Sequence, residues 1–406
     1  MENDCKELTE CLCCGGTDLT LVLDLGEQPL ANSFVKNPAA PEDVFPLRLN
    51  ICVKCSHLQL SHAVNPDLLF KNYLYVSGTS KTLLDYFDWF AETVTSQAGT
   101  NAKSVLDIAC NDGSQLNSFK KLGLTTYGVD PATNLHPISS ANHAVLCDYL
   151  TREHVTYFAD KKIDIITAQN VFAHNSYPLE FLEICRDIMH DGSTLFIQTS
   201  QAEMILNNEF DTIYHEHLSF FNTNSMNELA KRAGLYLVGA VKTPIHGTSY
   251  VFTFKKVTQD TSAVQKVIDS EYEAGLQYAT TYTEYAKKCH RVVEDLNAKV
   301  SELVSEGYLI VGYGAAAKGN TLLNFGKTFL DFIIDDNPLK QGLFTPGTHI
   351  PVVGIEDLQK ENIQKCKIAF VPLAWNFFTE IKSRVKKVRD NDLDVFVKYF
   401  PGMSVE

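Results

Sequence analysis

The chain has 406 residues, of which 45% are hydrophobic and 21% are charged, so it is a globular protein too long for one ordinary core. Its formal net charge of −14 argues against nucleic acid or an anionic membrane surface as the main partner. The acidic start MENDCKELTE lacks the features of a secretory signal, and no apolar run approaches the roughly 18 residues of a membrane span. We therefore expect a cytoplasmic protein of two or three domains.

The first region, residues 1–70, carries two CxxC pairs, Cys11/Cys14 and Cys52/Cys55. Each pair offers two thiolates at the reach of one tetrahedral zinc, and four ligands leave no open position for substrate. The chain has 11 cysteines, an odd number, and most are scattered, which suits a reducing compartment better than disulfides. We predict a structural zinc. A register that uses Cys13 as a ligand is the alternative, but it strains the spacing.

The second region, residues 71–258, alternates strand and helix signals. Strands separated by helix-length segments predict a parallel sheet, in which ligands lie beyond the carboxyl ends of the strands. The expected strands are 104–109, 126–130, 163–170 and 194–199, with a tight turn at 111–113 and a helix at 114–122 after the first strand.

The turn after the first of these strands favours S-adenosylmethionine over a dinucleotide. Asp107-Ile-Ala-Cys-Asn-Asp-Gly113 has one glycine where a dinucleotide-binding turn needs three, and S-adenosylmethionine has no phosphate to cradle. Its cationic groups favour nearby carboxylates, and its ribose hydroxyls suit an acid at the end of the second strand, here Asp130. The candidate cofactor-binding residues are Asp107, Ala109, Asn111, Asp112, Gly113, Asp130, Pro131 and Asp148.

The remainder divides into a helical linker, residues 259–306, and a second Rossmann-like region, residues 307–406. Gly312, Gly314 and Gly319 nearly form the dinucleotide fingerprint, with Asp335 where a ribose-binding acid is expected, but the spacing to the last glycine is wrong. The interpretation we favour is a Rossmann-like domain that binds no cofactor or that grips substrate. In the second case the ammonium of Lys318 is a candidate ligand for a phosphate.

Proton-active side chains gather in Asp211-Thr-Ile-Tyr-His-Glu-His-Leu-Ser-Phe-Phe221. A helical turn would place Tyr214 and His217 on one face, whereas an extended segment would place His215 with His217. Either arrangement gives a base a partner that orients it. The alternatives are a surface loop with a chance pair of histidines, and a catalytic metal on His-Glu-His, although the spacing is not HExxH.

Eight motifs together carry a resemblance over nearly the whole chain: CLCCGG with CVKCSHLQL, YLYVSGTSKT, LDIACNDGSQL, AQNVFAHN, FDTIYHEHLSFF, PIHGTSY, GYGAAAKGNTLLN and DDNPLKQGLFTPGTHIPV. In this order they resemble the zinc-containing, S-adenosylmethionine-dependent C-methyltransferases of deoxysugar biosynthesis. The resemblance implies an α/β protein with an N-terminal zinc-ribbon-like module, a central class I methyltransferase domain and a C-terminal Rossmann-like domain. It implies a nucleotide-linked 4-keto-6-deoxy sugar as substrate.

The resemblance also assigns roles to residues. Tyr214, Glu216 and His217 are expected to line the active site, with His217 as the general base. The candidate substrate-binding residues are Tyr75, Asn170, His174 and Lys318, of which the first three follow from the resemblance. The chain departs from the family at Ala109-Cys110, where Gly-Ser is usual, at Gln169, where Asn is frequent, and at Thr248, where Gly is frequent.

The chemistry expected of such a site is carbon methylation. A ketone beside the target carbon lets a base remove a proton to give an enolate, whose oxygen needs hydrogen-bond donors. Histidine suits this removal near neutral pH. Carbon 3 and thymidine diphosphate are the family's common case, and we favour a monomer. Two other readings remain: an NAD-dependent nucleotide-sugar oxidoreductase built on residues 307–406, and a non-enzymatic zinc-ribbon scaffold.

Overall fold

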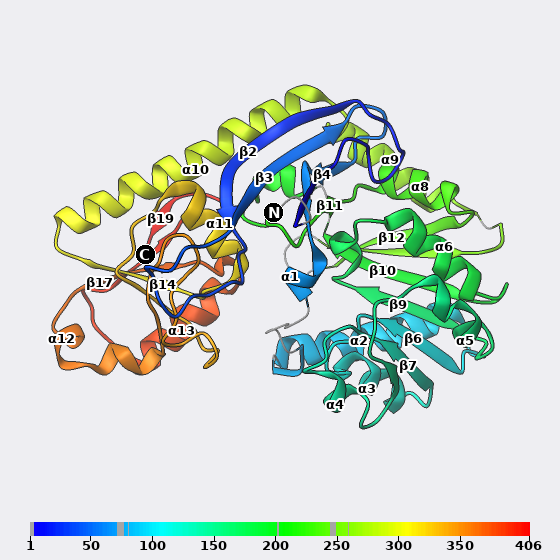
Figure 1. Cartoon of the computed structure of the whole chain (residues 1–406). Coiled ribbons are helices and arrows are strands. Elements are labelled where there is room, and N and C mark those ends of the chain that lie inside the picture. The colour runs from blue at the N-terminus through cyan, green and yellow to red at the C-terminus, as the bar shows by residue number, and fades with distance from the viewer. Residues whose placement is uncertain (1–3, 71–76, 80, 201–202, 244–248, 259) are drawn as a thin grey trace. The chain divides into compact units, whose positions relative to one another are not determined.

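The computed structural model describes residues 4–70, 77–79, 81–200, 203–243, 249–258 and 260–406 (Figure 1). The chain forms two compact units that interleave along the sequence. Unit 1 contains Met1–Thr20, Asn50–Glu203 and Glu216–Gln277, and unit 2 contains Leu21–Leu49, Met204–His215 and Tyr278–Glu406. The boundaries expected from the sequence at residues 70, 258 and 306 therefore stay a prediction, because neither unit is one continuous stretch.

Unit 1 is built on a seven-stranded sheet (Figure 1). In spatial order its strands are β12 (Tyr236–Thr243), β13 (Ser249–Lys255), β10 (Thr194–Ser200), β9 (Ile165–Gln169), β6 (Ser104–Ile108), β7 (Thr125–Val129) and β8 (Ala144–Leu146). The five strands from β10 to β8 are parallel, and β13 is antiparallel to both of its neighbours. The class I methyltransferase sheet expected from the sequence is confirmed.

Alternating side chains of these strands supply two apolar cores, as the period of two requires. Val105 and Ile165 share a core with helices α2 (Lys81–Ala98) and α3 (Ser114–Lys121). Leu106 and Ile166 belong to the other core, which helices on the opposite face complete: α5 (Val155–Ala159), α6 (Pro178–Ile188), α8 (Thr223–Arg232) and α9 (Ser262–Glu273). β6 is the first strand of this sheet, with β7 on one side and β9 on the other, so ligands are expected at the carboxyl ends of β6 and β9.

The N-terminal part adds small sheets. β1 (Cys5–Glu7) pairs with β5 (His62–Val64), which precedes the short helix α1 (Pro66–Phe70). A four-stranded sheet has the order β11 (Ser219–Phe220), β4 (Leu58–Leu60), β3 (Val44–Cys52) and β2 (Leu19–Pro29). β2 and β3 are long enough to contribute residues to both units.

Unit 2 is built on a second, six-stranded sheet. Its order is β16 (Val352–Val353), β15 (Phe332–Ile334), β14 (Leu309–Tyr313), β17 (Ile368–Pro372), β18 (Val395–Lys398) and β19 (Ser404–Val405), and only β19 is antiparallel to its neighbour. The helices of this unit are α7 (Met204–Asn207), α10 (Ala279–Ser305), α11 (Ala317–Gly326), α12 (Glu361–Gln364) and α13 (Phe378–Val388).

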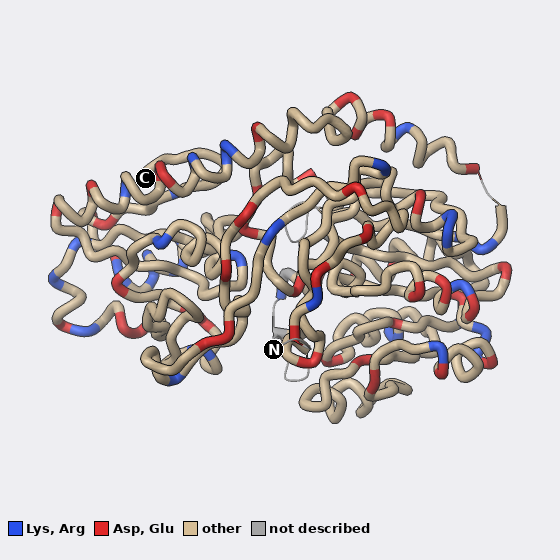
Figure 2. The backbone as a smooth tube through the Cα atoms, turned by 45° about the horizontal axis from the view of Figure 1, so that its top comes forward, with Lys and Arg blue, Asp and Glu red and all other residues tan. Residues whose placement is uncertain are grey.

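Acidic residues are spread over both units, in keeping with the net charge of −14 (Figure 2). Among the described residues, no helix has both the length and the apolar character needed to cross a membrane.

Candidate functional site

Four cysteine side chains of unit 1 meet in one cluster. The Sγ atoms of Cys11, Cys14, Cys52 and Cys55 all lie within 4.8 Å of one another. The Sγ atoms of Cys11 and Cys55 are 3.6 Å apart, and those of Cys14 and Cys52 are 3.5 Å apart. A tetrahedral zinc with Zn–S bonds of about 2.3 Å separates its sulfurs by about 3.8 Å. The four thiols therefore fit one zinc once the two closest pairs move slightly apart and the most distant sulfurs move closer together.

A tight turn follows each cysteine pair and keeps its two thiols on the same side. Gly15 N–H donates to Cys11 O and Ser56 N–H donates to Cys52 O, each at 2.9 Å, and both donors have positive φ. Cys13 is buried but stands outside the cluster, and burial raises the pKa of its thiol well above the ordinary value. Because the four sulfurs that come together are those of the two CxxC pairs, the structure favours this register over one that uses Cys13.

The turn between β6 and α3 has an unusual backbone. Ala109, Asn111 and Gly113 have φ angles of +59°, +52° and +81°. Asp130, just beyond β7, holds this turn: its Oδ2 accepts from Asn111 N–H and its Oδ1 from Ala132 N–H, both at 2.8 Å. The carboxylate is thereby fixed at the strand end, where a ribose hydroxyl is expected to reach it.

Asp107 lies inside the sheet beneath this turn and is 3% exposed. Thr167 Oγ1 donates to its Oδ1 at 2.7 Å. Burial raises the pKa of Asp107 to about 7, while the Thr167 hydroxyl lowers it and the Asp130 charge raises it. A buried carboxylate held partly protonated gains most from a cationic ligand, which restores its charge.

Asn111 and Asp112 bind protein backbone with their side chains. Ser77 N–H donates to Asn111 Oδ1 at 3.0 Å, and Gly78 N–H donates to Asp112 Oδ2 at 2.9 Å. A Cβ on Gly78 would lie 2.6 Å from that same Oδ2, so a larger residue there would displace the Asp112 carboxylate. Tyr75, expected to bind substrate, lies outside the described residues. This use of the two side chains was not indicated by the sequence.

Buried polar atoms without partners mark the carboxyl ends of β9 and β10. Gln198 is 0% exposed, and neither its Oε1 nor its Nε2 has a hydrogen-bond partner among the described residues. Gln169 stands opposite Gln198 in the parallel register, and its Oε1 is unpartnered within the same part of the chain. Each such atom costs about 1–3 kcal/mol unless a ligand or water meets it. A polar ligand such as S-adenosylmethionine therefore fits this edge of the sheet.

Gln198 was missed by sequence reasoning. Its signal is an amide that directly follows the apolar residues Leu195, Phe196 and Ile197 inside a predicted strand, which is atypical of a fully buried strand. Two other candidate residues, Pro131 and Asp148, lie beyond the ends of their strands, and Asp148 is exposed. Their roles toward the cofactor stay predictions.

His217 and His174 meet in unit 1, with ring centroids 5.1 Å apart. His174 also stacks on Phe70 at 5.5 Å, nearly parallel. Burial lowers the pKa of His174 to about 4, so its imidazole is neutral at working pH. Asn170 directly follows β9, with φ +53° and its N–H bonded to Gln198 O at 3.0 Å. His174 is four residues further on, so the histidine pair lies close to the carboxyl edge of the sheet.

The segment around His217 forms turns rather than a helix or a strand. Tyr214 and His215 belong to unit 2, whereas Glu216 and His217 belong to unit 1. His215 is buried, its Nε2 donates to Phe45 O at 3.2 Å, and burial lowers its pKa to about 4. A neutral, buried histidine whose proton is committed to a carbonyl has a structural role.

The glycine-rich turn of unit 2 is filled by protein. A Cβ on Gly314 would lie 3.1 Å from the Ala374 Cβ, and one on Gly319 would lie 3.0 Å from the Leu373 Cβ. These glycines thus serve close packing between loops. Asp335 accepts from Ala315 N–H at 2.7 Å and from Asn337 N–H at 2.8 Å. The acid expected to bind a ribose is used by the turn itself, and nothing here favours the NAD-dependent alternative.

Lys318, at the start of α11, does not extend toward solvent. Its Nζ is buried 5.1 Å from the centroid of the Trp375 ring and has no hydrogen-bond partner among the described residues. Its assignment as a phosphate ligand stays a prediction, and an anion would have to reach it beside the indole.

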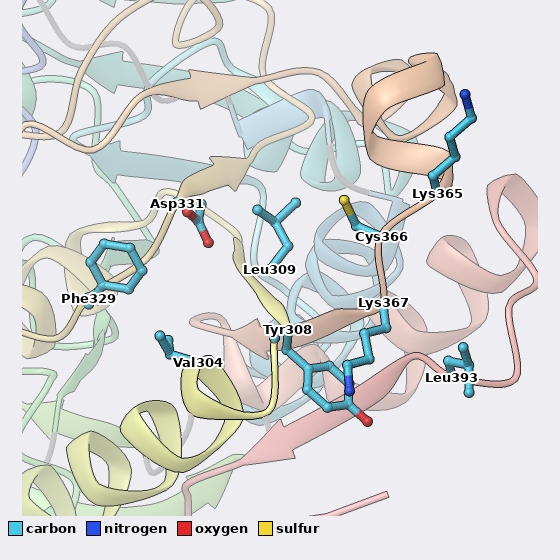
Figure 3. Close-up of a pocket in the computed structure, with 10 residues that line it drawn as sticks. Val304, Tyr308, Leu309, Phe329, Asp331, Lys365, Cys366, Lys367 and Leu393 are labelled. Atoms are coloured by element: carbon cyan, nitrogen blue, oxygen red, sulfur yellow. The ribbon is translucent and has the colours of Figure 1, made fainter.

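Unit 2 also has a surface hollow of about 600 Å³ (Figure 3). Tyr308, Asp331 and Lys367 line it, with the Lys367 ammonium 4.3 Å from the Tyr308 ring centroid. These residues flank the amino ends of β14, β15 and β17. Ligands of such sheets bind at the opposite edge, so this hollow is not the candidate site.

Three sequence families match consecutive parts of the chain: a zinc-binding domain at residues 11–70, a methyltransferase domain at 82–240 and a C-methyltransferase C-terminal domain at 244–401. The chain is also 28% identical over 404 residues to a Streptomyces niveus protein named C-methyltransferase NovU, an alignment that covers 96% of this chain and 95% of that one. These matches make the chain similar to zinc-binding C-methyltransferases over nearly its whole length. It is thus an S-adenosylmethionine-dependent enzyme.

Other relatives match a smaller share of the chain. A ubiquinone biosynthesis O-methyltransferase of Shewanella halifaxensis is 24% identical over 192 residues, which is 43% of this chain and 78% of that one. A solved SAM-dependent methyltransferase from Archaeoglobus fulgidus aligns with 43% of this chain and 94% of its own, at 15% identity and a TM-score of 0.35.

Proposed function

We propose that the chain methylates a carbon next to the ketone of a nucleotide-linked 4-keto-6-deoxy sugar, with carbon 3 as the target and thymidine diphosphate as the nucleotide. The observation that carries the proposal is the pairing of His217 with His174 near the carboxyl edge of the donor-binding sheet, at 5.1 Å between ring centroids. The relative named C-methyltransferase NovU, matched over nearly its full length, supports carbon as the acceptor.

In this proposal His217 removes the proton beside the ketone. The neighbouring His174 imidazole is neutral, because burial lowers its pKa to about 4. It therefore adds no positive charge that would oppose protonation of His217. Tyr214 is the candidate donor to the enolate oxygen, and Glu216 is the candidate that fixes the tautomer of the base or binds a sugar hydroxyl.

S-Adenosylmethionine supplies an electrophilic methyl group when bound. The residues that fit it are Asp130, fixed at the end of β7 by two backbone N–H groups, and Asp107, whose buried carboxylate favours a cationic partner. The unpartnered amide of Gln198 is a third candidate contact at this edge. The zinc takes no part, because four cysteines fill its coordination.

The deciding experiment is hydrogen exchange of the target proton in deuterated water without methyl donor. We expect His217→Asn to slow this exchange and turnover in parallel, by about two to four orders of magnitude. His215→Asn is the matched control: His215 is buried against Phe45 O, so its loss should lower the melting temperature and leave exchange by the folded protein unchanged. Wild-type exchange in His217→Asn would assign the base to another residue.

The substrate class is tested with a panel of nucleotide 4-keto sugars, S-adenosylmethionine and mass spectrometry. A product heavier by one methylene supports the proposal. A thermal-shift series with S-adenosylhomocysteine, thymidine diphosphate and NAD separates it from the oxidoreductase: the first two ligands should stabilise the chain and NAD should not.

A further inference from the structure

Residues 210–213 lie at the start of the segment with the proton-active side chains, Asp211 to Phe221. They contact a helix and a loop of the second sheet in their own unit. Trp375 Nε1–H donates to Asp211 Oδ2 at 2.7 Å, and Thr321 Oγ1 donates to Ile213 O at 2.9 Å. The Phe210 ring lies edge-on to Phe325, with 5.6 Å between centroids. Residues 210–213 are thus held by α11 and by the loop after β17, and Tyr214 follows directly.

Trp375 and the neighbouring Lys318, whose Nζ lies 5.1 Å from the Trp375 ring centroid, come from the place where a Rossmann-like sheet binds ligands. β14 is the first strand of the sheet, with β15 on one side and β17 on the other. Lys318 lies in the first turn of α11, after β14, and Trp375 lies just after β17. Both therefore stand at the carboxyl edge, at the point where the strand order reverses.

Asp211 and Lys318 form an incomplete pair. Asp211 is 2% exposed and its Oδ1 has no hydrogen-bond partner among the described residues; the same holds for Lys318 Nζ. Burial raises the pKa of Asp211 to about 6, while Lys318 and then the Trp375 N–H lower it. Two buried opposite charges that interact without sharing a hydrogen bond stabilise the fold less than a directly hydrogen-bonded pair would. This open arrangement therefore indicates a role other than stability.

We propose that Asp211 is a positioning residue for the methyl transfer, which with Trp375 and Lys318 fixes the chain that carries Tyr214 to the carboxyl edge of the second sheet. This rests on the proposed function, because Tyr214 matters only if it serves the enolate. Tyr214 is three residues from Asp211, so its Cα cannot lie more than about 11 Å away. A displacement of about 1 Å at a reacting group can cost a hundredfold in rate.

The arrangement also makes a prediction about substrate. An anionic group at this edge, such as the diphosphate of a nucleotide sugar, would satisfy the open Lys318 ammonium beside the Trp375 ring.

The test compares graded variants at Asp211. Asp211→Asn keeps an acceptor for Trp375 but removes the charge that faces Lys318, and Asp211→Ala removes both. We expect kcat to fall about threefold in the first and about tenfold to a hundredfold in the second, with deuterium exchange of the target proton falling in parallel. The dissociation constant of S-adenosylhomocysteine should stay unchanged. All rates are measured well below the melting temperature, so that only folded protein is compared.

Two further variants separate positioning from folding. Trp375→Phe keeps an aromatic ring under Lys318 but loses the N–H donor, and it should add little in the Asp211→Ala background because one interaction is removed twice. Asp331→Ala is the matched control for Asp211→Ala: Asp331 Oδ2 accepts from Ile310 N–H at 2.8 Å at the amino edge of the same sheet, so loss of this acceptor should lower stability without changing kcat.

The outcomes distinguish a failure of the positioning role from a failure of the proposed function. Unchanged kcat and exchange in folded Asp211→Ala and Trp375→Phe, with only lower melting temperatures, would overturn the positioning role while leaving the proposed function intact. Fully additive losses would also overturn it. Absence of exchange and of methylated product with the wild-type chain over the whole sugar panel would overturn both.

Discussion

Replacing the buried carboxylate of Asp107 should stabilise the chain while weakening its hold on the methyl donor. Asp107 is 3% exposed and burial raises its pKa to about 7. Asp107→Asn keeps an acceptor for the Thr167 hydroxyl, which lies 2.7 Å from Oδ1, and removes the need to ionise a group inside the sheet. The variant loses the charge that a cationic ligand would use.

The magnitude follows from linkage. The unfolded pKa is about 3.9, so between about pH 4 and 7 the native state holds a proton that the unfolded chain has lost, and stability falls as pH rises. At 1.36 kcal/mol per unit, the penalty is roughly 2 kcal/mol at pH 5.5 and roughly 4 kcal/mol above pH 7. Asp107→Asn has no carboxylate to ionise, so this penalty is absent from its free energy of unfolding. Its advantage should therefore grow by roughly 2 kcal/mol between pH 5.5 and 8.5, which is about 4–8 °C for a domain of 150–250 residues.

The assay is calorimetric melting of wild type and variant at pH 5.5 and 8.5 without ligand. Thr167→Val is the opposite control: it removes the hydroxyl that favours the carboxylate, so it should destabilise more at pH 8.5 than at 5.5. Titration with S-adenosylhomocysteine at pH 8.5 should show weaker binding to Asp107→Asn. An equal melting increment at the two pH values, or a variant less stable than wild type at pH 8.5, would refute the reasoning.

Three other outcomes are expected. Cys52→Ser should lower the melting temperature and the zinc content by elemental analysis, with little change in turnover by the folded fraction; protein purified without chelator that contains no zinc would contradict this. Asp130→Ala should weaken S-adenosylhomocysteine binding by roughly 1.5–3 kcal/mol in calorimetry, and unchanged affinity would show that the ribose lies elsewhere. Gln198→Leu should raise stability without ligand, because two unpartnered buried atoms disappear, and should weaken binding of donor or sugar; unchanged affinity for both would assign those atoms to buried water.

Features set by local chemistry could be predicted from the sequence. The two CxxC pairs predicted the ligands of one zinc, and the structure brings all four sulfurs together across 38 to 44 residues. The strand and turn signals from residue 104 to 130 placed Asp107 and Asp130 correctly at the first two strands. In both cases the residue types and their spacing carry the physical requirement themselves.

Features that depend on distant contacts could not be predicted. Nothing near Gln198 shows that its amide is left unpartnered, because that depends on α2, α3 and the neighbouring strand. The sequence left open whether residues 214–217 are helical or extended; the structure has turns there, in a segment whose start is held by contacts with distant residues, such as the hydrogen bond from Trp375 to Asp211. A regular periodicity cannot report a segment whose shape is imposed from outside.

The two Rossmann-like turns show why a motif alone does not identify a cofactor site. In unit 1, Asp130 accepts from the N–H of Asn111 in the turn after the first strand, at 2.8 Å. In unit 2, Asp335 accepts from Ala315 N–H in the corresponding turn, at 2.7 Å. Each carboxylate also bonds the N–H two residues ahead of it. An acid about 20 residues after a glycine turn therefore reports closure of the turn as much as binding of a ribose.

The neighbours of each turn decide the difference. In unit 2, Lys340 Nζ donates to Ala315 O at 2.7 Å and Ala374 fills the space beside Gly314, so protein atoms already satisfy the turn. In unit 1, the edge keeps Asp107 with a raised pKa, and the Gln198 amide has no hydrogen-bond partner in the part of the chain that the structure describes. Buried polar atoms without hydrogen-bond partners cost free energy, and a bound ligand offsets that cost by supplying the partners. In the proposed function the methyl donor therefore belongs at the first sheet. The atoms without partners at the edge of the second sheet among the described residues, Asp211 Oδ1 and Lys318 Nζ, belong to the proposed positioning of the chain that carries Tyr214.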